Sequence, residues 1–429
     1  MRLSAKHFTV LGAGFAGLEL CYTQLVRLQN LREHAAAFLC WIGLALLFFF
    51  LIVAWLRRNA AVLSGSRGLL LASLAAAVVF RLTLFGLTPT LSEDIYRYVW
   101  DGRVQQAGIN PYAYAPIDPA LAPLRTFESR LINHPDIATI YPPLTQFAFR
   151  AGAAIGPTLW SQKFIFVMCD LAIIALLMWW LPQLGIPALM SLIYAWHPLA
   201  VVEVAGSGHN DPLGIAWLLI GLIAWQSRRQ LEATSAFALA FLSKFATLLL
   251  WPFYAVRARR WLVVFLGLVL LGGWWARCSP HLSGTSLHYG ADWECNSSLY
   301  LLLRVLWRSA LAARLTAVVA LAGYGVRLAI RCDDLIGYTL RMLQAAVLLA
   351  PVVEPWYVLW LLPLLCLRFS WGWLVFSGAV MASYAVQIEY VAHGIWRIPL
   401  WARWAAYGQL YAWLVWQGIA VIRRGRQPA

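Results

Sequence analysis

Residues 35–56 read AAAFLCWIGLALLFFFLIVAWL, a run of 22 positions without a charged side chain. A helix of about 20 apolar residues is long enough to cross the hydrocarbon core of a bilayer. Comparable segments recur along the whole chain, so we predict an all-α, polytopic integral membrane protein with about 12–14 transmembrane helices in one domain, residues 1–429. The segments are 7–26, 35–56, 68–88, 164–182, 186–205, 211–227, 261–276, 310–330, 335–352, 371–391 and 404–422, with shorter ones at 356–367 and at 233–256, where we expect a hairpin of two half-length helices.

The composition excludes an ordinary soluble protein. Hydrophobic residues make up 62% of the chain and charged residues only 12%, about half the charged share of a globular domain. The net charge is +15, but no basic tail or aromatic-basic module is present, so we do not expect nucleic-acid binding. The basic residues instead lie in short loops beside the apolar segments, which the positive-inside rule places in the cytoplasm. These clusters are Arg57–Arg58, Arg228–Arg229, Arg257 with Arg259–Arg260, Arg327 with Arg331, and Arg423–Arg424 with Arg426.

The loops that alternate with these basic loops are predicted to be extracytoplasmic. They also contain most of the 18 acidic residues, although acidic residues contribute little to membrane orientation. A single polar cavity at the extracytoplasmic end would account for this bias. The predicted loops are 89–142, 206–211, the Ser243–Lys244 turn, 277–298, the 353–355 turn and 392–403. Three further acids at membrane depth, Asp170, Glu203 and Glu389, are interpreted as structurally paired.

The most polar of these loops begins with SEDIYRYVWDGRVQQAGINPYAYAP at residues 92–116. If residues 93–101 are helical, Asp94, Arg97, Tyr98 and Asp101 lie on one face. This pattern predicts an amphipathic helix at the membrane interface. Its polar stripe is interpreted either as a set of surface ion pairs or as part of an active site. The turn GINPY at 108–112 follows the helix, and YPPL at 141–144 marks the return to the membrane.

Two other patterns have structural explanations. GAGFAG at residues 12–17 matches a dinucleotide-binding motif, but no soluble βαβ unit can follow it. Small residues four apart, such as Gly12 with Ala16 and Ala13 with Gly17, favour close helix packing in lipid instead. Cys278 and Cys295 share one predicted extracytoplasmic loop, where an oxidising compartment would allow them to pair. The other five cysteines are scattered.

The order of motifs along the chain resembles the bacterial membrane-embedded GT-C-type glycosyltransferases. The resemblance begins with Glu93–Asp94, YRYVWDGRV, GINPYAYAP and YPPL. It continues with WHPL at 196–199, GHND at 208–211, Lys244–Phe245, NSSL at 296–299 and EPWY at 354–357. The chain is similar to mannosyltransferases that use a polyprenyl-phosphate-linked sugar. In that superfamily an acidic residue of the first long external loop is the catalytic base. The resemblance therefore implies Asp94 as the base, with Glu93, where relatives often have Asp, as its neighbour or substitute.

The chemistry of such a transfer requires these residue types. A carboxylate takes the proton of the acceptor hydroxyl, and cationic donors hold the departing phosphate. For Lys244, snorkelling to the interface is the structural alternative. Asp211, before Pro212, is interpreted as a helix N-cap, which leaves His209 and Asn210 as ligands. The residues assigned to donor phosphate or sugar binding are Arg97, Tyr98, Asp101, Arg103, His209, Asn210, Lys244, Glu354 and Trp356.

The sequence favours no metal site. The residues His281, His288, Asp292 and Glu294 match no zinc spacing. The remaining alternative is a divalent cation, Mg²⁺ or Mn²⁺, bound jointly by Glu93, Asp94 and a phosphate.

The resulting hypothesis is a membrane glycosyltransferase in the plasma membrane with its active site outside the cytoplasm. The resemblance implies mannose as the sugar, a polyprenyl-phosphate donor, a hydroxyl acceptor on a lipid-linked glycan or glycolipid, and inversion at the anomeric carbon. One alternative is a multi-pass transporter or flippase of a lipid or small solute, although the chain shows no convincing internal repeat. Another is a lipid-linked oligosaccharide ligase or polymerase.

Overall fold

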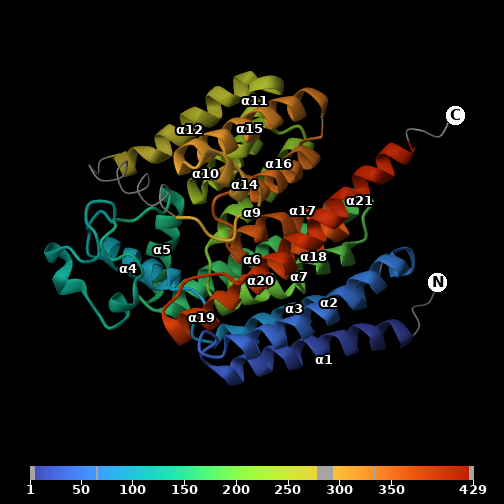
Figure 1. The fold of residues 1–429 in the computed structure, drawn as a ribbon, viewed down its shortest axis with the longest axis horizontal. Helices are drawn as coiled ribbons and strands as arrows, with labels where there is room; N and C mark the ends of the chain where they lie inside the picture. Colours follow the sequence, from blue (N-terminus) through green and yellow to red (C-terminus); the bar gives the residue numbers. More distant parts are fainter. Residues whose placement is uncertain (1–4, 64–65, 278–292, 333, 425–429) are drawn as a thin grey trace.

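The computed structural model describes residues 5–63, 66–277, 293–332 and 334–424. Within these ranges the protein is built from helices without a named strand, which confirms the all-α prediction (Figure 1). The apolar segments lie in helices because a bilayer leaves the backbone no other hydrogen-bond partners. The first half contains α1 (Ala5–Leu28), α2 (Ala35–Leu63), α3 (Arg67–Phe85), α4 (Asp94–Gln106), η1 (Pro119–Leu124), η2 (Glu128–Leu131), α5 (Pro143–Ile155), α6 (Leu159–Gln183), η3 (Ala188–Ser191), α7 (Leu192–Ala195), α8 (Pro198–Ala200) and η4 (Val201–Gly206).

The second half continues the same architecture, with several helices interrupted by 3₁₀ or π-helical turns. It contains α9 (Asp211–Gln226), α10 (Gln230–Ser243), η5 (Phe245–Leu250), α11 (Trp251–Arg257), α12 (Arg259–Arg277), α14 (Leu299–Trp307), α15 (Ala310–Arg331), α16 (Leu335–Leu349), η6 (Pro355–Leu361), α17 (Leu362–Leu367), α18 (Trp371–Ala379), η7 (Val380–Ala385), α19 (Val386–His393), α20 (Leu400–Arg403), η8 (Trp404–Gly408) and α21 (Gln409–Arg424).

The helix lengths agree with a polytopic membrane protein. In the described ranges, six helices are long and apolar enough to cross a membrane. A seventh crossing is formed if residues 188–195 and 198–206, which meet at an angle of 55°, count as one broken span. Four more apolar helices have only 10–17 residues. The predicted total of 12–14 crossings included such short segments and stays a prediction.

Two breaks in the helices bring polar residues to one end of the protein. The hairpin expected over 233–256 is present as α10 followed by η5 and α11, with Lys244 extended between them at φ −160°. The 55° bend precedes the π-helical segment η4, which carries Glu203 toward the loop before α9. Such irregular backbone at membrane depth is tolerated only where protein or a cavity surrounds it.

The GAGFAG motif lies in the middle of α1, where it packs against α2. A Cβ atom on Gly14 would come within 2.5 Å of Ile52, and one on Gly17 within 2.9 Å of Phe48. The helix-packing interpretation is therefore confirmed for this motif. Gly12 does not take part, since nothing lies within 4 Å of its Cβ position.

A buried ion pair joins three helices in the core. Arg81 of α3 donates from Nε to Asp170 Oδ2 of α6 at 2.6 Å and from Nη1 to the Ala195 carbonyl at 2.5 Å. The Tyr194 hydroxyl donates to the other oxygen of Asp170 at 2.6 Å. Both charged side chains are 1% exposed or less. The predicted structural pairing of Asp170 is confirmed.

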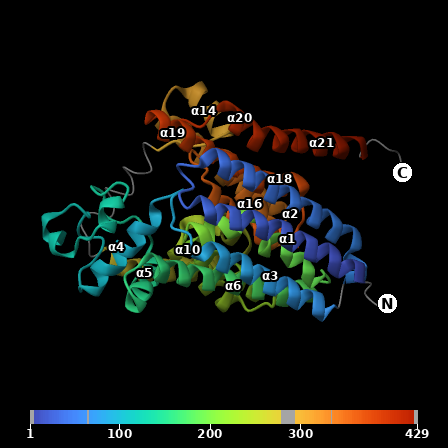
Figure 2. The ribbon, with the colours of Figure 1, turned by 90° about the horizontal axis from the view of Figure 1, so that it is seen from below.

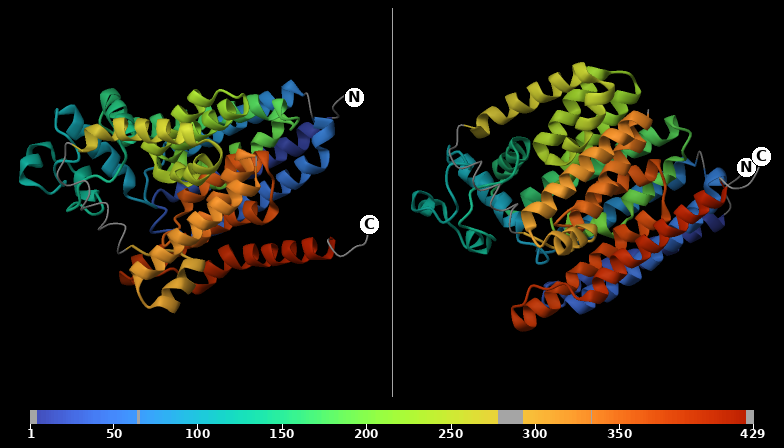
Figure 3. Two further views of the ribbon diagram at one scale, coloured as in Figure 1. Left: turned by 90° about the horizontal axis from the view of Figure 1, so that it is seen from above. Right: turned by 45° about the horizontal axis from the view of Figure 1, so that its top comes forward.

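The two ends of the molecule differ in character. The start of α1 and the end of α21 lie at one end, and α4 with the loop that follows it lies at the other (Figures 1 and 2). Two further views show the same separation, with the loop over residues 107–142 extending beyond the helices (Figure 3). The functional candidates gather at the end that carries α4.

Candidate active site

The site is built around the first turn of α4. The helix supposed over residues 93–101 is present and begins at Asp94, and the backbone N–H of Asp94 donates to the Ser92 hydroxyl oxygen at 3.3 Å. A carboxylate in the first turn is favoured by the positive end of the helix dipole. The rest of α4 packs against α5 and α6 and is buried almost all round. Protein therefore surrounds α4 on almost every side, whereas the predicted amphipathic helix at the membrane interface would leave one face to lipid.

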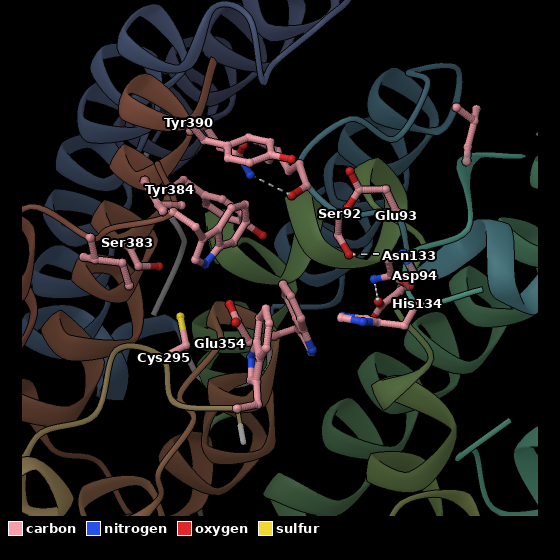
Figure 4. Close-up of a pocket in the computed structure, with 18 of the residues that line it drawn as sticks. Ser92, Glu93, Asp94, Asn133, His134, Cys295, Glu354, Ser383, Tyr384 and Tyr390 are labelled. Carbon is pink, nitrogen blue, oxygen red and sulfur yellow. Dashed lines mark hydrogen bonds between the residues drawn. The ribbon is translucent and has the colours of Figure 1, made fainter. Parts of the chain in front are cut away.

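Asp94 opens onto a cavity of about 540 Å³ (Figure 4). Its walls come from segments far apart in the sequence, and most of them are loops predicted to lie on the extracytoplasmic side. The view shows Asp94 and Asn133 on one side of the cavity and Glu354, Cys295 and Tyr384 on the other. The polar and aromatic lining residues are Ser92, Glu93, Asp94, Arg130, Asn133, His134, Trp293, Cys295, Glu354, Trp356, Tyr357, Ser383, Tyr384, Gln387, Tyr390 and Trp396.

Few groups contact the Asp94 carboxylate directly. Asn133 donates from Nδ2 to Oδ1 at 3.3 Å, and His209 Nδ1 lies 3.9 Å from Oδ2. The side chain of Asp94 is 23% exposed, so one edge faces the cavity. Burial raises the pKa of Asp94 above its usual range, and the Asn133 hydrogen bond only partly offsets this rise. A carboxylate of raised pKa is a stronger base than one in water.

A buried histidine, His209, and a second carboxylate, Glu203, lie behind Asp94. His209 is stacked on Trp356 with ring centroids 4.0 Å apart and an interplanar angle of 16°. Its Nε2 is 3.4 Å from Glu203 Oε2, and Glu203 is fully buried. The Tyr384 hydroxyl donates to both Glu203 oxygens, at 2.9 and 3.1 Å. His209 and Trp356, both predicted from their motifs, thus meet next to Asp94.

Sequence reasoning missed Glu203, Asn133 and Tyr384. Glu203 was interpreted as structurally paired, although an ionisable residue within an apolar segment is a functional candidate by default. Nothing in the local sequence distinguishes Asn133 or Tyr384. Their proximity to Asp94 and Glu203 depends on how η2 and η7 pack.

Glu93 differs from Asp94 in having an arginine as its partner. It forms an ion pair with Arg32, in the turn between α1 and α2, and the two side chains are 33% and 23% exposed. Glu93 lies at the rim of the cavity, with its charge neutralised by Arg32. Asp94 is thus the less neutralised of the two adjacent carboxylates.

Glu354 faces the cavity from the opposite side. Residues 295 and 351–353 are held together by backbone hydrogen bonds of 2.9 and 3.0 Å, which fix this wall. Burial raises the pKa of Glu354 to about 7, with a smaller contribution from the charge of Asp94 and opposing hydrogen bonds from Cys295 and Trp293. The predicted partner of Cys295, Cys278, lies outside the described residues.

Four of the predicted donor-binding residues lie along α4 away from the cavity lining. Arg97 donates from Nε to Asp101 at 2.9 Å, and Gln146 donates to the other Asp101 oxygen at 2.8 Å. The Tyr98 ring packs against Tyr141, Phe149 and Phe166. Arg103 contacts the Pro157 carbonyl at 3.5 Å on the surface. Asp101 and Tyr98 therefore hold α4 against α5 and α6, whereas Arg97 bonds within α4.

Lys244 and Asp211 form a second charged pair near the cavity. Lys244 Nζ donates to Asp211 Oδ2 at 2.6 Å and lies 5.0 Å from the Tyr357 ring centroid. Trp360 donates to the other Asp211 oxygen at 2.7 Å. The N-cap interpretation of Asp211 is wrong, because α9 begins at Asp211 and its carboxylate is used by Lys244 and Trp360. Asn210, 3% exposed, has no hydrogen-bond partner for either of its side-chain polar atoms.

A family model for alpha-(1->6)-mannopyranosyltransferases, N-terminal domain, matches residues 7–260. This is more than half of the 429 residues. The chain belongs to the alpha-(1->6)-mannopyranosyltransferase family. The matched region contains Asp94, Asn133, Glu203, His209 and Lys244.

A curated relative supports the same family. Alpha-(1->6)-mannopyranosyltransferase A of Mycobacterium tuberculosis is 24% identical over 200 residues, which cover 44% of this chain and 36% of the relative. The match therefore spans only about a third of that protein's length. No solved structure matches the chain.

Within the parts of this mannopyranosyltransferase-family chain that the structure describes, no group of three or more His, Cys, Asp or Glu side chains is arranged to hold a metal ion. His281, His288 and Asp292 lie outside those parts. Glu294, the remaining member of that set, instead pairs with Arg304 at 3.3 Å and accepts from Tyr300 at 2.8 Å.

Proposed function

We propose that this protein transfers mannose from a polyprenyl-phosphate donor to a hydroxyl group of a lipid-linked glycan or glycolipid, with inversion and with Asp94 as general base. The observation that carries the proposal is the position of Asp94, partly exposed, at the wall of the 540 Å³ cavity. Family membership supports mannose as the sugar. A cavity of this size accommodates sugar-sized ligands.

The reaction uses the two faces of this cavity. An acceptor hydroxyl next to Asp94 loses its proton to the carboxylate as its oxygen attacks the anomeric carbon. The bond from that carbon to the phosphate oxygen breaks, and the polyprenyl phosphate leaves with the electron pair. Arg130 is the one arginine among the described lining residues, and it is suited to stabilise the leaving phosphate. A sugar ring can stack on the aromatic wall around Trp356 and Trp396.

We also propose that the cavity faces the extracytoplasmic side of the plasma membrane. The loops that converge on it alternate with the loops rich in arginine, which the positive-inside rule places in the cytoplasm. A cysteine in an Ala107→Cys variant, at the exposed end of α4, should react with an impermeant thiol reagent in intact cells. Ser227→Cys, in an exposed basic loop, should react only after permeabilisation. The reverse pattern would contradict the orientation.

Purified protein in liposomes tests the activity. We expect radiolabel to move from polyprenyl-phosphate mannose, and not from a nucleotide-linked mannose, to a glycolipid acceptor. Transfer from the nucleotide donor would overturn the proposed donor. Movement of an unreacted lipid or solute across the bilayer without transfer would instead indicate the transporter alternative.

A further inference from the structure

His209 lies between two carboxylates and makes no hydrogen bond to either. Its Nδ1 is 3.9 Å from Asp94 Oδ2, and its Nε2 is 3.4 Å from Glu203 Oε2. Both ring nitrogens are buried without a hydrogen-bond partner. Buried polar atoms are nearly always paired, so two unpaired atoms on one ring require an explanation.

The surroundings favour one tautomer of the neutral ring. The Tyr384 hydroxyl donates to both oxygens of Glu203, which favours the ionised form of this carboxylate against the cost of its burial. A proton on Nε2 would face this carboxylate, which leaves the lone pair of Nδ1 directed at Asp94. A lone pair facing an ionised Asp94 forms no hydrogen bond. It forms one as soon as Asp94 becomes protonated, after a small closing of the 3.9 Å gap.

We propose that His209 receives the proton that Asp94 takes from the acceptor, and that Glu203 holds the ring in the tautomer that allows this. The inference rests on the transfer reaction proposed above. The proton moves from the acceptor oxygen to Asp94 Oδ2 and then to His209 Nδ1. Asp94 returns to its ionised form. Burial lowers the pKa of His209, and the carboxylates on either side of the imidazolium offset this cost during the transfer. When products leave, the proton returns through Asp94 to water in the cavity.

The same geometry argues against His209 as a phosphate ligand. Asp94 and Glu203 both lie within 4 Å of the ring nitrogens, and their negative charges would repel a phosphate there. The stacked Trp356 ring covers one face of the imidazole. His209 thus acts through Asp94 as a positioning and proton-accepting residue. The charged and titratable groups around it and its partners are Asp94, Glu203, Lys244, Asp211, Glu354 and Tyr384.

Kinetics of two variants separate this role from a purely structural one. Glu203→Gln should lower kcat about 10- to 100-fold, the usual cost of losing a residue that orients a reacting group, with the donor KM unchanged. His209→Phe keeps a ring to stack on Trp356 and should lower kcat by about 10²- to 10³-fold. Glu389→Gln, the same chemical change on α19 at a residue that does not line the cavity, is the control. A raised donor KM with unchanged kcat would overturn the inference, as would full activity in both variants.

A spectroscopic measurement does not depend on activity. In protein labelled with ¹⁵N-histidine, the signal lost in His209→Phe identifies His209, and its ¹⁵N shifts report the tautomer. We expect the Nε2–H form in the wild type and a changed tautomer ratio in Glu203→Gln. An Nδ1–H ring, or no response to Glu203→Gln, would refute the relay. Absence of transfer by the wild type would instead refute the proposed function, and the tautomer would still decide the relay.

Discussion

Two of the clusters of ionisable residues, the core cluster around Arg81 and Asp170 and the cavity cluster around His209, differ in how completely their atoms are paired. In the core cluster, Arg81 and Asp170 bond to each other, and Tyr194 and the Ala195 carbonyl complete the set. In the cavity cluster, His209 lies 3.9 Å from Asp94 and 3.4 Å from Glu203, and both nitrogens of His209 lack a hydrogen bond. The polar atoms of the core cluster are thus all hydrogen-bonded (a closed cluster), whereas the cavity cluster keeps unpaired polar atoms (an open cluster).

We propose that this difference distinguishes charged residues with a structural role from charged residues that take part in the reaction. A closed pair costs desolvation but leaves no group unsatisfied, so its role is to fix helix positions. An open cluster costs free energy for each unpaired atom, which is tolerated at a site that binds ligands or moves protons. Substitutions in the two clusters should therefore affect different measurements.

The largest effect is expected for Asp94→Asn. The amide keeps the shape of the side chain and can still contact Asn133, but it cannot take up a proton. We expect transfer to fall about 10²- to 10⁴-fold, the range for loss of a general base, with the thermal midpoint in detergent nearly unchanged. Asp101→Asn, also on α4, is the matched control. Its partners Arg97 and Gln146 predict a loss of stability rather than of chemistry.

Asp170→Asn should act on stability. It leaves Arg81 buried without a counter-charge, which costs about 3–5 kcal/mol. Thermal unfolding in detergent should show a lower midpoint, while activity per folded molecule is retained. The double variant Arg81→Met with Asp170→Leu should recover much of the loss, because an apolar pair leaves no uncompensated charge. If the double variant is less stable than either single one, the pairing account is wrong.

A pH-dependent effect is expected from Glu354. Its pKa in the folded protein, about 7, lies above its ordinary value of 4.5, so the folded state holds the proton more tightly than the unfolded chain. Stability should therefore fall as the pH rises from about 4.5 to about 7, and level off above that. Glu354→Gln should show a smaller fall across this window in thermal midpoints. Equal pH dependence in both proteins would assign the effect to other groups.

The smallest effect is expected for Glu93→Gln. The Arg32 pair is partly exposed, and such pairs contribute about 0–1 kcal/mol. We expect kcat/KM for transfer to change less than about fivefold, the equivalent of 1 kcal/mol. A loss comparable to that of Asp94→Asn would mean that both carboxylates take part in the chemistry.

The sequence was sufficient to predict the all-α membrane fold, a helix within residues 93–101 and the break at Lys244, because these depend on local hydrophobicity and on local turn signals. It could not show that Arg97 and Asp101 bond within α4, since both an ion pair and a ligand site have the same spacing. For Glu203, the sequence shows an ionisable residue within an apolar segment but not its position beside His209. Only the 55° bend and the π-helical segment bring it to His209, and neither has a reliable sequence signal.

The most direct test is a single-turnover transfer assay with equal amounts of folded Asp94→Asn and Asp170→Asn protein, using radiolabelled polyprenyl-phosphate mannose in liposomes. Both variants replace an aspartate by asparagine, one in the cavity cluster and the other in the core cluster. We predict that Asp94→Asn loses at least about 10²-fold in rate, while Asp170→Asn stays within severalfold of the wild type. Equal losses in the two variants, or a faster Asp94→Asn protein, would contradict the assignment of the chemistry to the open cluster.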